Sequence, residues 1–392
     1  MDHFATSKVR GFGTSVFAEM SRLSVEHNAV NLGQGFPDFP GPAFAKEAAK
    51  RAIDADLNQY AISHGQPRLR RAIAAMYASQ TGHEVNPDSD ITVASGATEV
   101  IFDAIQAFIG VGDELIAFEP FYDSYPASTI LAGGVFKPIR LHPPDWSFDL
   151  EALRRAITPR TRVILLNTPH NPTGKVFTEA ELQAVADLAI AHDLVVLSDE
   201  VYDRITYGGA VHRSIALLPR MWDRTLTINS TGKTFSMTGW KIGFAIGPAA
   251  LNAALRAVHQ FVTFASATPF QEAMAESLEL AQQSDYYATL ARDYDARRVL
   301  LTNALEAAGL PILPISGSYF LMADFAALGF PNDVAFCRWL VSEIGVAAVP
   351  PSAFYQQPET APLLARFCFA KRAETITEAA NRLQRIPTVL HR

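Results

Sequence analysis

Residues 162–199 read RVILLNTPHNPTGKVFTEAELQAVADLAIAHDLVVLSD. The stretch begins with the run RVILLN and ends with LVVLSD, and continuous apolar runs of this kind are typical of strands buried on both faces of a sheet. Between them lie a loop with proline and glycine and then TEAE at 178–181, a capping-box pattern that predicts the start of a helix. Leu182, Val185 and Ala189 fall on one face of that helix. The stretch therefore predicts a strand–helix–strand unit.

Similar signals flank this unit on both sides. Three further apolar runs indicate strands, DITVA at 90–94, ELIAF at 114–118 and TLTIN at 225–229, and a helix is expected to start near Thr98. Strands that alternate with helices predict an α/β fold with a mostly parallel central sheet sandwiched by helices. Ligands of such sheets bind at the carboxyl ends of the strands.

The pattern changes after about residue 285. A long charged stretch at 286–308 predicts a helix, and shorter apolar runs follow it. We therefore expect a smaller α+β domain over residues 286–392 and a large domain over residues 41–285. Residues 1–40 are expected to form an irregular N-terminal arm, rich in glycine and proline, that joins the small domain.

The composition limits the class of protein. The 392 residues carry 33 Lys and Arg against 40 Asp and Glu, a formal charge of −7, and this balance argues against nucleic acid as a partner. Charged residues make up 19%, below the roughly 25% of an average soluble protein, which favours large buried surfaces such as a subunit interface. No run of ~18 apolar residues occurs, so we expect no membrane span.

The cysteines and histidines bear on compartment and metal binding. Only Cys337 and Cys368 occur, which excludes a disulfide framework or a multi-cysteine metal cluster and suits a reducing compartment. His170 and His212 have no partners at metal-ligand spacing, so we interpret both as loop histidines and expect no metal site. The first residues, MDHFAT, lack the pattern of a signal peptide, and we predict a cytoplasmic enzyme.

Two nucleotide-binding motifs are incomplete. GKT at 232–234 resembles the end of a phosphate-binding P-loop, but Thr227 stands where that loop needs a glycine. GQG at 33–35 begins like a dinucleotide fingerprint, but Asp38 stands at the third glycine position. Neither a P-loop nor a Rossmann nucleotide site is therefore expected.

A different set of motifs follows four of the predicted strands. These are SGAT at 95–98, NPTG at 171–174, DEVY at 199–202 and STGK at 230–233. The run STGKTFSMTGWKIG at 230–243 resembles, almost position for position, the lysine signature of the class I/II aminotransferases, which are pyridoxal 5'-phosphate (PLP) enzymes of fold type I.

The resemblance covers most of the chain, from about Asn31 to Arg372. NLGQGFPDF at 31–39 and RFCF at 366–369 are most similar to the subgroup of methionine, kynurenine and glutamine aminotransferases. The resemblance implies a fold type I PLP-transferase, with PLP as the cofactor, residues 41–285 as the PLP-binding domain, and a homodimer.

Three residues would carry the catalysis if the resemblance holds. Lys233 would bind the coenzyme aldehyde through its amine and, once freed, move the proton between the amino acid Cα and the coenzyme. Asp199 would keep the pyridine nitrogen protonated, and Tyr202 would hydrogen-bond the phenolic oxygen. Taken without the family, Lys233 could be a surface charge and Asp199 a helix N-cap.

The resemblance also assigns the remaining coenzyme contacts. Backbone N–H groups and a hydroxyl at a helix start would bind the phosphate, helped by a serine and a lysine, while Asn171 would contact the phenolic oxygen and Tyr122 would stack on the ring. The full cofactor set is Lys233, Asp199, Tyr202, Asn171, Gly96, Ala97, Thr98, Tyr122, Ser230, Lys241 and Tyr60. Tyr60 would reach the phosphate of the neighbouring subunit. By themselves, Asn171 could stabilise its loop, Tyr122 could pack in the core and Tyr60 could be an ordinary tyrosine.

The substrate contacts follow from the same resemblance. Arg366 would bind the α-carboxylate through a bidentate pair, although its alternating surroundings also fit a charge on an edge strand. The predicted substrate set is Arg366, Gly35, Asn171, Tyr122 and Tyr125. Tyr125, Phe320 and the arm residues Phe12 and Phe17 indicate an apolar pocket, and no arginine suits a distal carboxylate.

These residues predict transfer of an amino group from an L-amino acid of the methionine, aromatic or kynurenine, or glutamine type to a 2-oxo acid by a ping-pong mechanism. Two alternatives use the same machinery, a cysteine-conjugate β-lyase and an N-succinyldiaminopimelate-type aminotransferase. A third, a PLP-binding regulator without enzymatic activity, is disfavoured because only about thirty residues precede Asn31, too few for a DNA-binding module.

Overall fold

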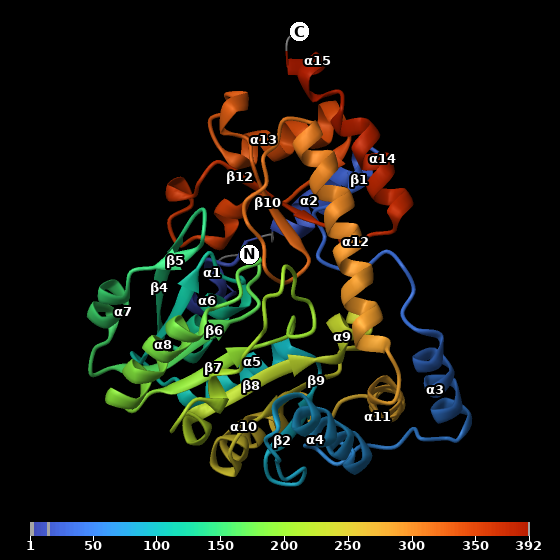
Figure 1. Ribbon diagram of the computed structural model, residues 1–392. Helices are drawn as coiled ribbons and strands as arrows, with labels where there is room; N and C mark the ends of the chain where they lie inside the picture. Colours follow the sequence, from blue (N-terminus) through green and yellow to red (C-terminus); the bar gives the residue numbers. More distant parts are fainter. Residues whose placement is uncertain (1–3, 14–15, 391–392) are drawn as a thin grey trace.

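The computed structural model describes residues 4–13 and 16–390. An eight-stranded sheet forms its centre, in the order β2-β9-β8-β7-β6-β3-β4-β5 (Figure 1). The strands are β2 (Ile91–Ala94), β3 (Glu114–Glu119), β4 (Val135–His142), β5 (Ser147–Phe148), β6 (Thr161–Asn167), β7 (Val195–Asp199), β8 (Thr225–Ser230) and β9 (Gly243–Ile246). The adjacent strands β8, β7, β6, β3 and β4 pair in parallel. Strand β9 pairs antiparallel with both β2 and β8, and β5 pairs antiparallel with β4.

Helices cover both faces of this sheet. The large-body helices are α3 (Ala43–Asp54), α4 (Pro67–Thr81), α5 (Ala97–Phe108), α6 (Ser124–Ala132), α7 (Leu150–Ala156), α8 (Glu179–Ala191), α9 (Thr231–Thr234), α10 (Ala249–Val262) and α11 (Thr268–Gln282). Within β6, Ile164 faces a cluster that includes α8, whereas Leu165 faces a second cluster that includes α5. Because successive strand residues point to opposite faces, both faces of the sheet are buried, as the apolar runs predict.

Local sequence signals explain how the predicted strand–helix–strand unit forms. The Thr178 side chain accepts a hydrogen bond from the Glu181 backbone, and the Glu181 carboxylate accepts one from the Thr178 backbone. This capping box fixes the start of α8 directly after the loop that follows β6. The parallel pairing of β6 with β7 confirms the unit.

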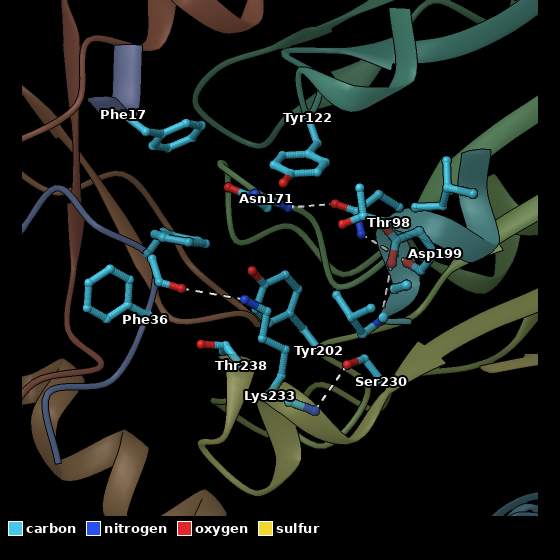
Figure 2. Close-up of a pocket in the computed structure, with 18 of the residues that line it drawn as sticks. Phe17, Phe36, Thr98, Tyr122, Asn171, Asp199, Tyr202, Ser230, Lys233 and Thr238 are labelled. Atoms are coloured by element: carbon cyan, nitrogen blue, oxygen red, sulfur yellow. Dashed lines mark hydrogen bonds between the residues drawn. The ribbon is translucent and has the colours of Figure 1, made fainter. Parts of the chain in front are cut away.

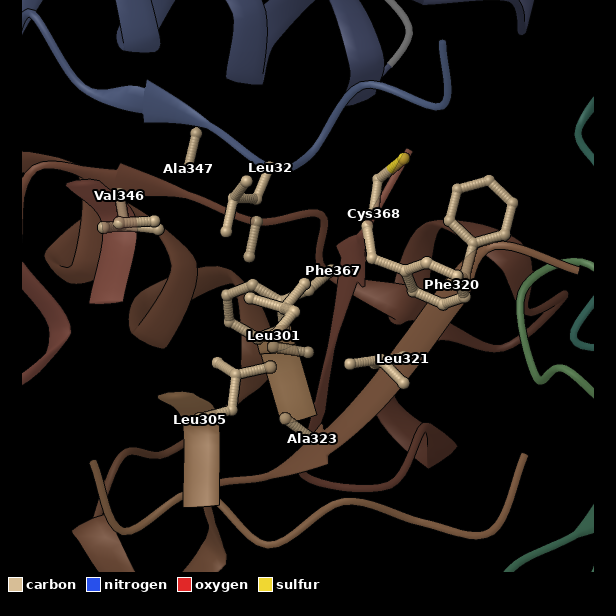
Figure 3. Packing of buried hydrophobic residues seen from close by; sticks show 14 of the residues in the cluster. Leu32, Leu301, Leu305, Phe320, Leu321, Ala323, Val346, Ala347, Phe367 and Cys368 are labelled. Carbon is tan, nitrogen blue, oxygen red and sulfur yellow. The ribbon is translucent and has the colours of Figure 1, made fainter. Parts of the chain in front are cut away.

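A second group of elements forms around its own core. It consists of α2 (Val16–Glu26), β1 (Val30–Asn31), α12 (Tyr286–Ala307), β10 (Phe320–Asp324), α13 (Asp333–Trp339), β11 (Val346–Ala347), β12 (Leu364–Cys368), α14 (Ala373–Leu383) and α15 (Ile386–Leu390). The short helix α1 (Ser7–Arg10) lies instead against α6 of the large body, where Lys8 donates to the Leu131 carbonyl. Strand β10 pairs antiparallel with β12, and β1 pairs in parallel with β11. Leu32 packs with Leu301, Leu321 and Phe367 in one buried cluster (Figure 3).

The N-terminal arm differs in part from its prediction. It is not wholly irregular, because α2 covers eleven residues and buries Met20 against the core of the second group. The helix was missed because glycine and proline near residue 35 dominate the local signal, while α2 lies before them. The pairing of β1 with β11 nevertheless brings the arm to the C-terminal elements. The domain limits at residues 40 and 285 stay a prediction.

The strand directions explain where the site lies. Strands β6, β7 and β8 are parallel, and β2 runs in the same direction as β8 because both pair antiparallel with β9. Their carboxyl ends therefore meet at one edge of the sheet. The four motifs that follow these strands are brought together there.

Candidate active site

A cavity of about 390 Å³ opens at this edge of the sheet, between the large body and the second group of elements (Figure 2). Its size suits a small organic ligand. Thirteen of the fourteen predicted site residues line it: Gly35, Gly96, Ala97, Thr98, Tyr122, Tyr125, Asn171, Asp199, Tyr202, Ser230, Lys233, Lys241 and Arg366. Tyr60 does not line the cavity.

Lys233 lies in α9, directly after β8. The Ser230 side chain caps this short helix by accepting a hydrogen bond from the Gly232 N–H at 3.0 Å, which fixes the backbone that carries the lysine. Lys233 Nζ donates to Tyr319 Oη at 2.8 Å and lies 3.5 Å from the Gly35 carbonyl oxygen. Burial lowers the pKa of the Lys233 amine to about 8. Lys233 is thus a cavity residue, and the alternative of a surface charge is wrong.

Asp199 ends β7 and is buried. The Tyr125 hydroxyl donates a 2.6 Å hydrogen bond to Asp199 Oδ2, and the Val201 N–H lies 3.4 Å from Oδ1. Burial raises the pKa of Asp199 to about 6, although the hydrogen bond from Tyr125 opposes that rise. No regular helix begins at Glu200, so the reading of Asp199 as a helix N-cap is wrong. A buried carboxylate of this kind is suited to pair with a cationic ring nitrogen.

The start of α5 forms a cradle for an anion. Gly96 has a φ of +87°, which a glycine adopts without strain, and the next N–H groups begin the helix. A side chain on Gly243 would lie closer than 3.0 Å to the Gly96 and Ala97 backbone, so glycine at that position lets β9 approach the cradle. Lys241 brings its amine to the same place, since a Cβ on Gly96 would lie 2.8 Å from its Nζ. Backbone N–H groups with a nearby cation fit a phosphate.

Arg366 lies in β12 and is only 1% exposed, so the alternative of a solvated edge-strand charge is wrong. Its Nη1 donates to Asn171 Oδ1 at 3.0 Å and its Nη2 to the Gly33 carbonyl at 2.9 Å. The guanidinium carbon lies 4.1 Å from the centre of the Phe320 ring. Its Nε is buried without a hydrogen-bond partner among the described residues. A buried guanidinium with a free donor is suited to bind a carboxylate.

Tyr202 and Tyr122 are aromatic walls of the cavity (Figure 2). Burial raises the pKa of both phenols, that of Tyr122 to about 12, so both stay protonated and can donate hydrogen bonds. Tyr122 meets Tyr125 edge to face at 5.8 Å between ring centres. Tyr125 also donates its hydroxyl hydrogen bond to Asp199. The prediction of an apolar pocket did not include this polar contact.

Sequence reasoning missed other residues at the cavity. Tyr319 contacts Lys233 and Gly35, Asn167 donates to the Asp199 carbonyl, and Phe36 lines the wall. Of the two predicted arm aromatics, Phe17 lines the cavity and Phe12 does not. Phe36 lies within the run at 31–39 that carries the family resemblance, so its place at the cavity could have been predicted from that run.

The two histidines singled out in the sequence lie in loops, as expected. His170 Nδ1 pairs with Thr173 Oγ1 at 2.8 Å, and burial lowers its pKa to about 3. His212 Nε2 pairs with Glu200 at 2.8 Å. Both side chains thus have protein partners.

Comparison with known proteins identifies the family. Residues 27–383 match the family described as aminotransferase class I and II. The chain is 41% identical to a methionine aminotransferase of Escherichia coli, covering 97% of this chain and 98% of the relative, and 39% identical to a kynurenine–oxoglutarate transaminase of Dictyostelium discoideum, covering 97% and 96%. The solved structure of N-succinyldiaminopimelate aminotransferase from Mycobacterium tuberculosis superposes with a TM-score of 0.94 at 42% identity, covering 97% of this chain and all of that one.

The chain belongs to the class I and II aminotransferases. It has the fold type I architecture and is a PLP-dependent enzyme that catalyses transamination. The donor set of the cavity fits the coenzyme, since the cradle at Gly96 suits its phosphate, Asp199 its pyridine nitrogen and Lys233 its aldehyde. None of the helices in the described ranges combines the length and apolar character that a membrane span needs.

Proposed function

We propose that this enzyme takes the amino group from an L-amino acid with an apolar, aromatic or amide side chain, of the methionine, kynurenine or glutamine type. The composition of the cavity wall carries this proposal. Arg366 is the single arginine among the described residues that line the cavity, and Phe17, Phe36 and Phe320 supply apolar surface. A second carboxylate on the substrate would find no arginine there.

Each residue of the cavity then has a role. The bound coenzyme supplies the electron sink that acidifies the amino acid Cα. Lys233 binds the aldehyde and later moves the proton at Cα, which its lowered pKa favours because the neutral amine is accessible near neutral pH. Asp199 holds the pyridine nitrogen, and Tyr202 and Asn171 orient the phenolic oxygen.

The other contacts bind and orient. The N–H groups of Ala97 and Thr98 hold the phosphate together with Ser230 and Lys241, and Tyr122 covers the ring. The Gly96 N–H donates to the Ala94 carbonyl at 2.8 Å, so Gly96 contributes the shape of the turn. Arg366 and the Gly35 backbone bind the α-carboxylate. Both substrates use the same carboxylate site. The first product therefore leaves as a 2-oxo acid before the second 2-oxo acid enters, and the cycle is ping-pong.

We also propose a homodimer in which Tyr60 serves the partner's coenzyme. Tyr60 is 86% exposed and contacts Phe264 edge to face at 5.4 Å. Ile62, Phe261 and Val262 are exposed apolar residues of the same two segments. Exposed apolar patches of this kind commonly mark subunit interfaces. The unpaired, buried Cys337 and Cys368 support the expectation of a cytoplasmic location.

A substrate panel tests the proposal. We expect kcat/KM for methionine, phenylalanine, kynurenine or glutamine to exceed that for aspartate or N-succinyldiaminopimelate. The ratio should be at least about tenfold, because the dicarboxylic substrates would lack one charged hydrogen bond to their second carboxylate. Lys233→Ala should abolish transamination, whereas Lys50→Ala, at an exposed surface lysine, should not change it. A preference for a dicarboxylic substrate would overturn the substrate assignment, and an active Lys233→Ala enzyme would overturn the role of the lysine.

A further inference from the structure

Tyr319 connects the catalytic lysine to the N-terminal arm. It lies just before β10 and is fully buried, and its hydroxyl contacts Lys233 and Gly35 and also lies beside the Tyr202 hydroxyl. Lys233 Nζ donates to its oxygen at 2.8 Å, and the hydroxyl donates to the Gly35 carbonyl at 2.5 Å. A chain of two hydrogen bonds thus runs from the lysine to the loop that carries Gly35.

The direction of these bonds defines what the phenol can do. A phenol has one proton, and the Gly35 carbonyl can only accept, so the Tyr319 proton points to Gly35 and its oxygen lone pair faces Lys233. Burial raises the pKa of Tyr319 well above its usual value, which keeps this proton in place. Tyr319 is therefore an acceptor for the lysine amine rather than an acid.

The ring of Tyr319 is held on several sides. It stacks on Tyr294 with ring centres 5.9 Å apart and meets Tyr202 edge to face at 5.0 Å. A side chain packed in this way offers the lysine a fixed acceptor, whereas a lysine amine on its flexible stem has no fixed position by itself. Lys233 has no other side-chain hydrogen-bond partner among the described residues.

We propose that Tyr319 is a positioning residue for Lys233: its hydroxyl oxygen receives the lysine amine whenever the amine is not bonded to the coenzyme. The proposal rests on the proposed role of Lys233. It deepens that role, because an amine that must move a proton at the amino acid Cα needs a defined place beside it. The link to Gly35 also couples the lysine to the proposed carboxylate contact on the same residue.

The test compares coenzyme-loaded Tyr319→Phe and Tyr294→Phe with the parent enzyme. Tyr319→Phe keeps the stacked ring and removes the hydroxyl. Tyr294→Phe removes a neighbouring hydroxyl that does not hydrogen-bond to Lys233. Coenzyme affinity, which reports an intact site, should stay unchanged in both variants.

The first half-reaction with L-methionine is then followed under single-turnover conditions. We expect its rate constant to fall about tenfold or more in Tyr319→Phe and to stay unchanged in Tyr294→Phe, a loss typical of a misplaced general base. The isotope effect from α-deuterated methionine should rise in Tyr319→Phe, because proton transfer becomes slower relative to the other steps. A merely structural defect would not raise it.

A double variant separates this proposal from the role of Lys233. Because Lys233→Ala by itself removes the half-reaction, the double variant is compared through the rate that an added alkylamine restores to Lys233→Ala. If Tyr319 acts through the lysine, Tyr319→Phe should cost nothing further in that restored rate. An unchanged rate and isotope effect in Tyr319→Phe would overturn the role of Tyr319 but not that of Lys233. So would a loss in the Lys233→Ala background as large as the loss in the parent enzyme. An undiminished half-reaction in Lys233→Ala would overturn the role of the lysine and with it this proposal.

Discussion

At the scale of single residues, the two central ionisable groups are held with pKa values close to neutral. Burial lowers the pKa of Lys233 to about 8 and raises that of Asp199 to about 6. Both shifts have the same cause, because a charge in a buried site loses its hydration. A ligand that supplies the missing partner charge or bond therefore strongly stabilises the charged form of such a group.

The pKa of Asp199 makes coenzyme binding depend on pH. Below about 6 the carboxyl is protonated and cannot pair with a cationic ring nitrogen, so the Kd of the coenzyme should fall as pH rises through this range. Asp199→Asn should bind at least about tenfold more weakly at pH 8, the cost of a charged hydrogen bond. Equilibrium titration of both proteins between pH 5 and pH 8, roughly the window around this pKa, measures the effect.

Groups of the coenzyme titrate in the same way with both proteins. Subtracting the pH profile of log Kd for Asp199→Asn from that of the parent enzyme therefore cancels their contribution. The difference should show one step near the pKa of Asp199. Parallel profiles for the parent enzyme and Asp199→Asn would contradict the assignment.

Most of the site could be predicted at this scale, and the exceptions have a physical reason. Lys233, Ser230 and Lys241 fall in one run of fourteen residues, STGKTFSMTGWKIG, which a resemblance can recognise. Tyr319 contacts Lys233 across 86 residues of sequence, and its local surroundings predict only a strand. Contacts made solely by tertiary packing leave no periodic or local pattern.

At the scale of elements, the phosphate cradle depends on how closely β9 approaches α5. Gly243→Ala would place a Cβ against the Gly96 and Ala97 backbone, which cannot move as a flexible side chain can. We expect coenzyme affinity to fall about tenfold or more, since overpacking of this kind costs roughly 1–3 kcal/mol. Titration with PLP measures it.

Gly239→Ala is the matched control for this variant. Nothing lies within 4 Å of a Cβ at Gly239, so that variant should bind the coenzyme as the parent enzyme does. An equal loss in both variants, or none in Gly243→Ala, would contradict the importance of this close approach.

A buried ionic contact joins α5 to α10. His259 Nδ1 lies 2.9 Å from Glu99 and 3.5 Å from Asp103, while Nε2 lies 2.8 Å from the Ser63 carbonyl. Burial opposes its charge, but these hydrogen bonds raise the pKa of His259 to about 9. Both ring nitrogens therefore carry protons near neutral pH.

The raised pKa of His259 predicts how stability changes with pH. The folded state holds this proton more tightly than the unfolded state, so the stabilisation is complete below the ordinary pKa of 6.5 and is lost as pH rises through about 9. The Tm difference between the parent enzyme and His259→Gln should therefore shrink over this interval. A difference that stays constant from pH 6.5 to pH 9 would contradict the charged contact.

At the scale of the whole molecule, the sequence predicted the layered α/β body better than the arm. Continuous apolar strands and a capping box are local signals, and the sheet confirms them. The pairing of β1 with β11 joins residues more than three hundred positions apart, and no local pattern specifies it. The subunit arrangement lies beyond one chain and stays a proposal.

Mixing two inactive variants tests that arrangement. Lys233→Ala lacks the amine, and Tyr60→Ala lacks the proposed phosphate contact. If Tyr60 acts across a two-fold interface, random reassociation should restore about a quarter of the parent activity, because half of the dimers contain one intact site. Recovery is measured after unfolding and refolding the mixture, with each variant refolded alone as the control. No recovery despite mixed dimers would mean that Tyr60 does not act in the partner's site.

The central claim is that the cavity at Lys233 transfers an amino group. Coenzyme-loaded enzyme is mixed with L-methionine without an acceptor, and both the 2-oxo acid and free ammonia are quantified over time. We expect a single burst of 2-oxo acid equal to the number of sites, no ammonia, and renewed turnover when a second 2-oxo acid is added. Continued release of ammonia without an acceptor, which a lyase would give, or the same burst from Lys233→Ala, would contradict it.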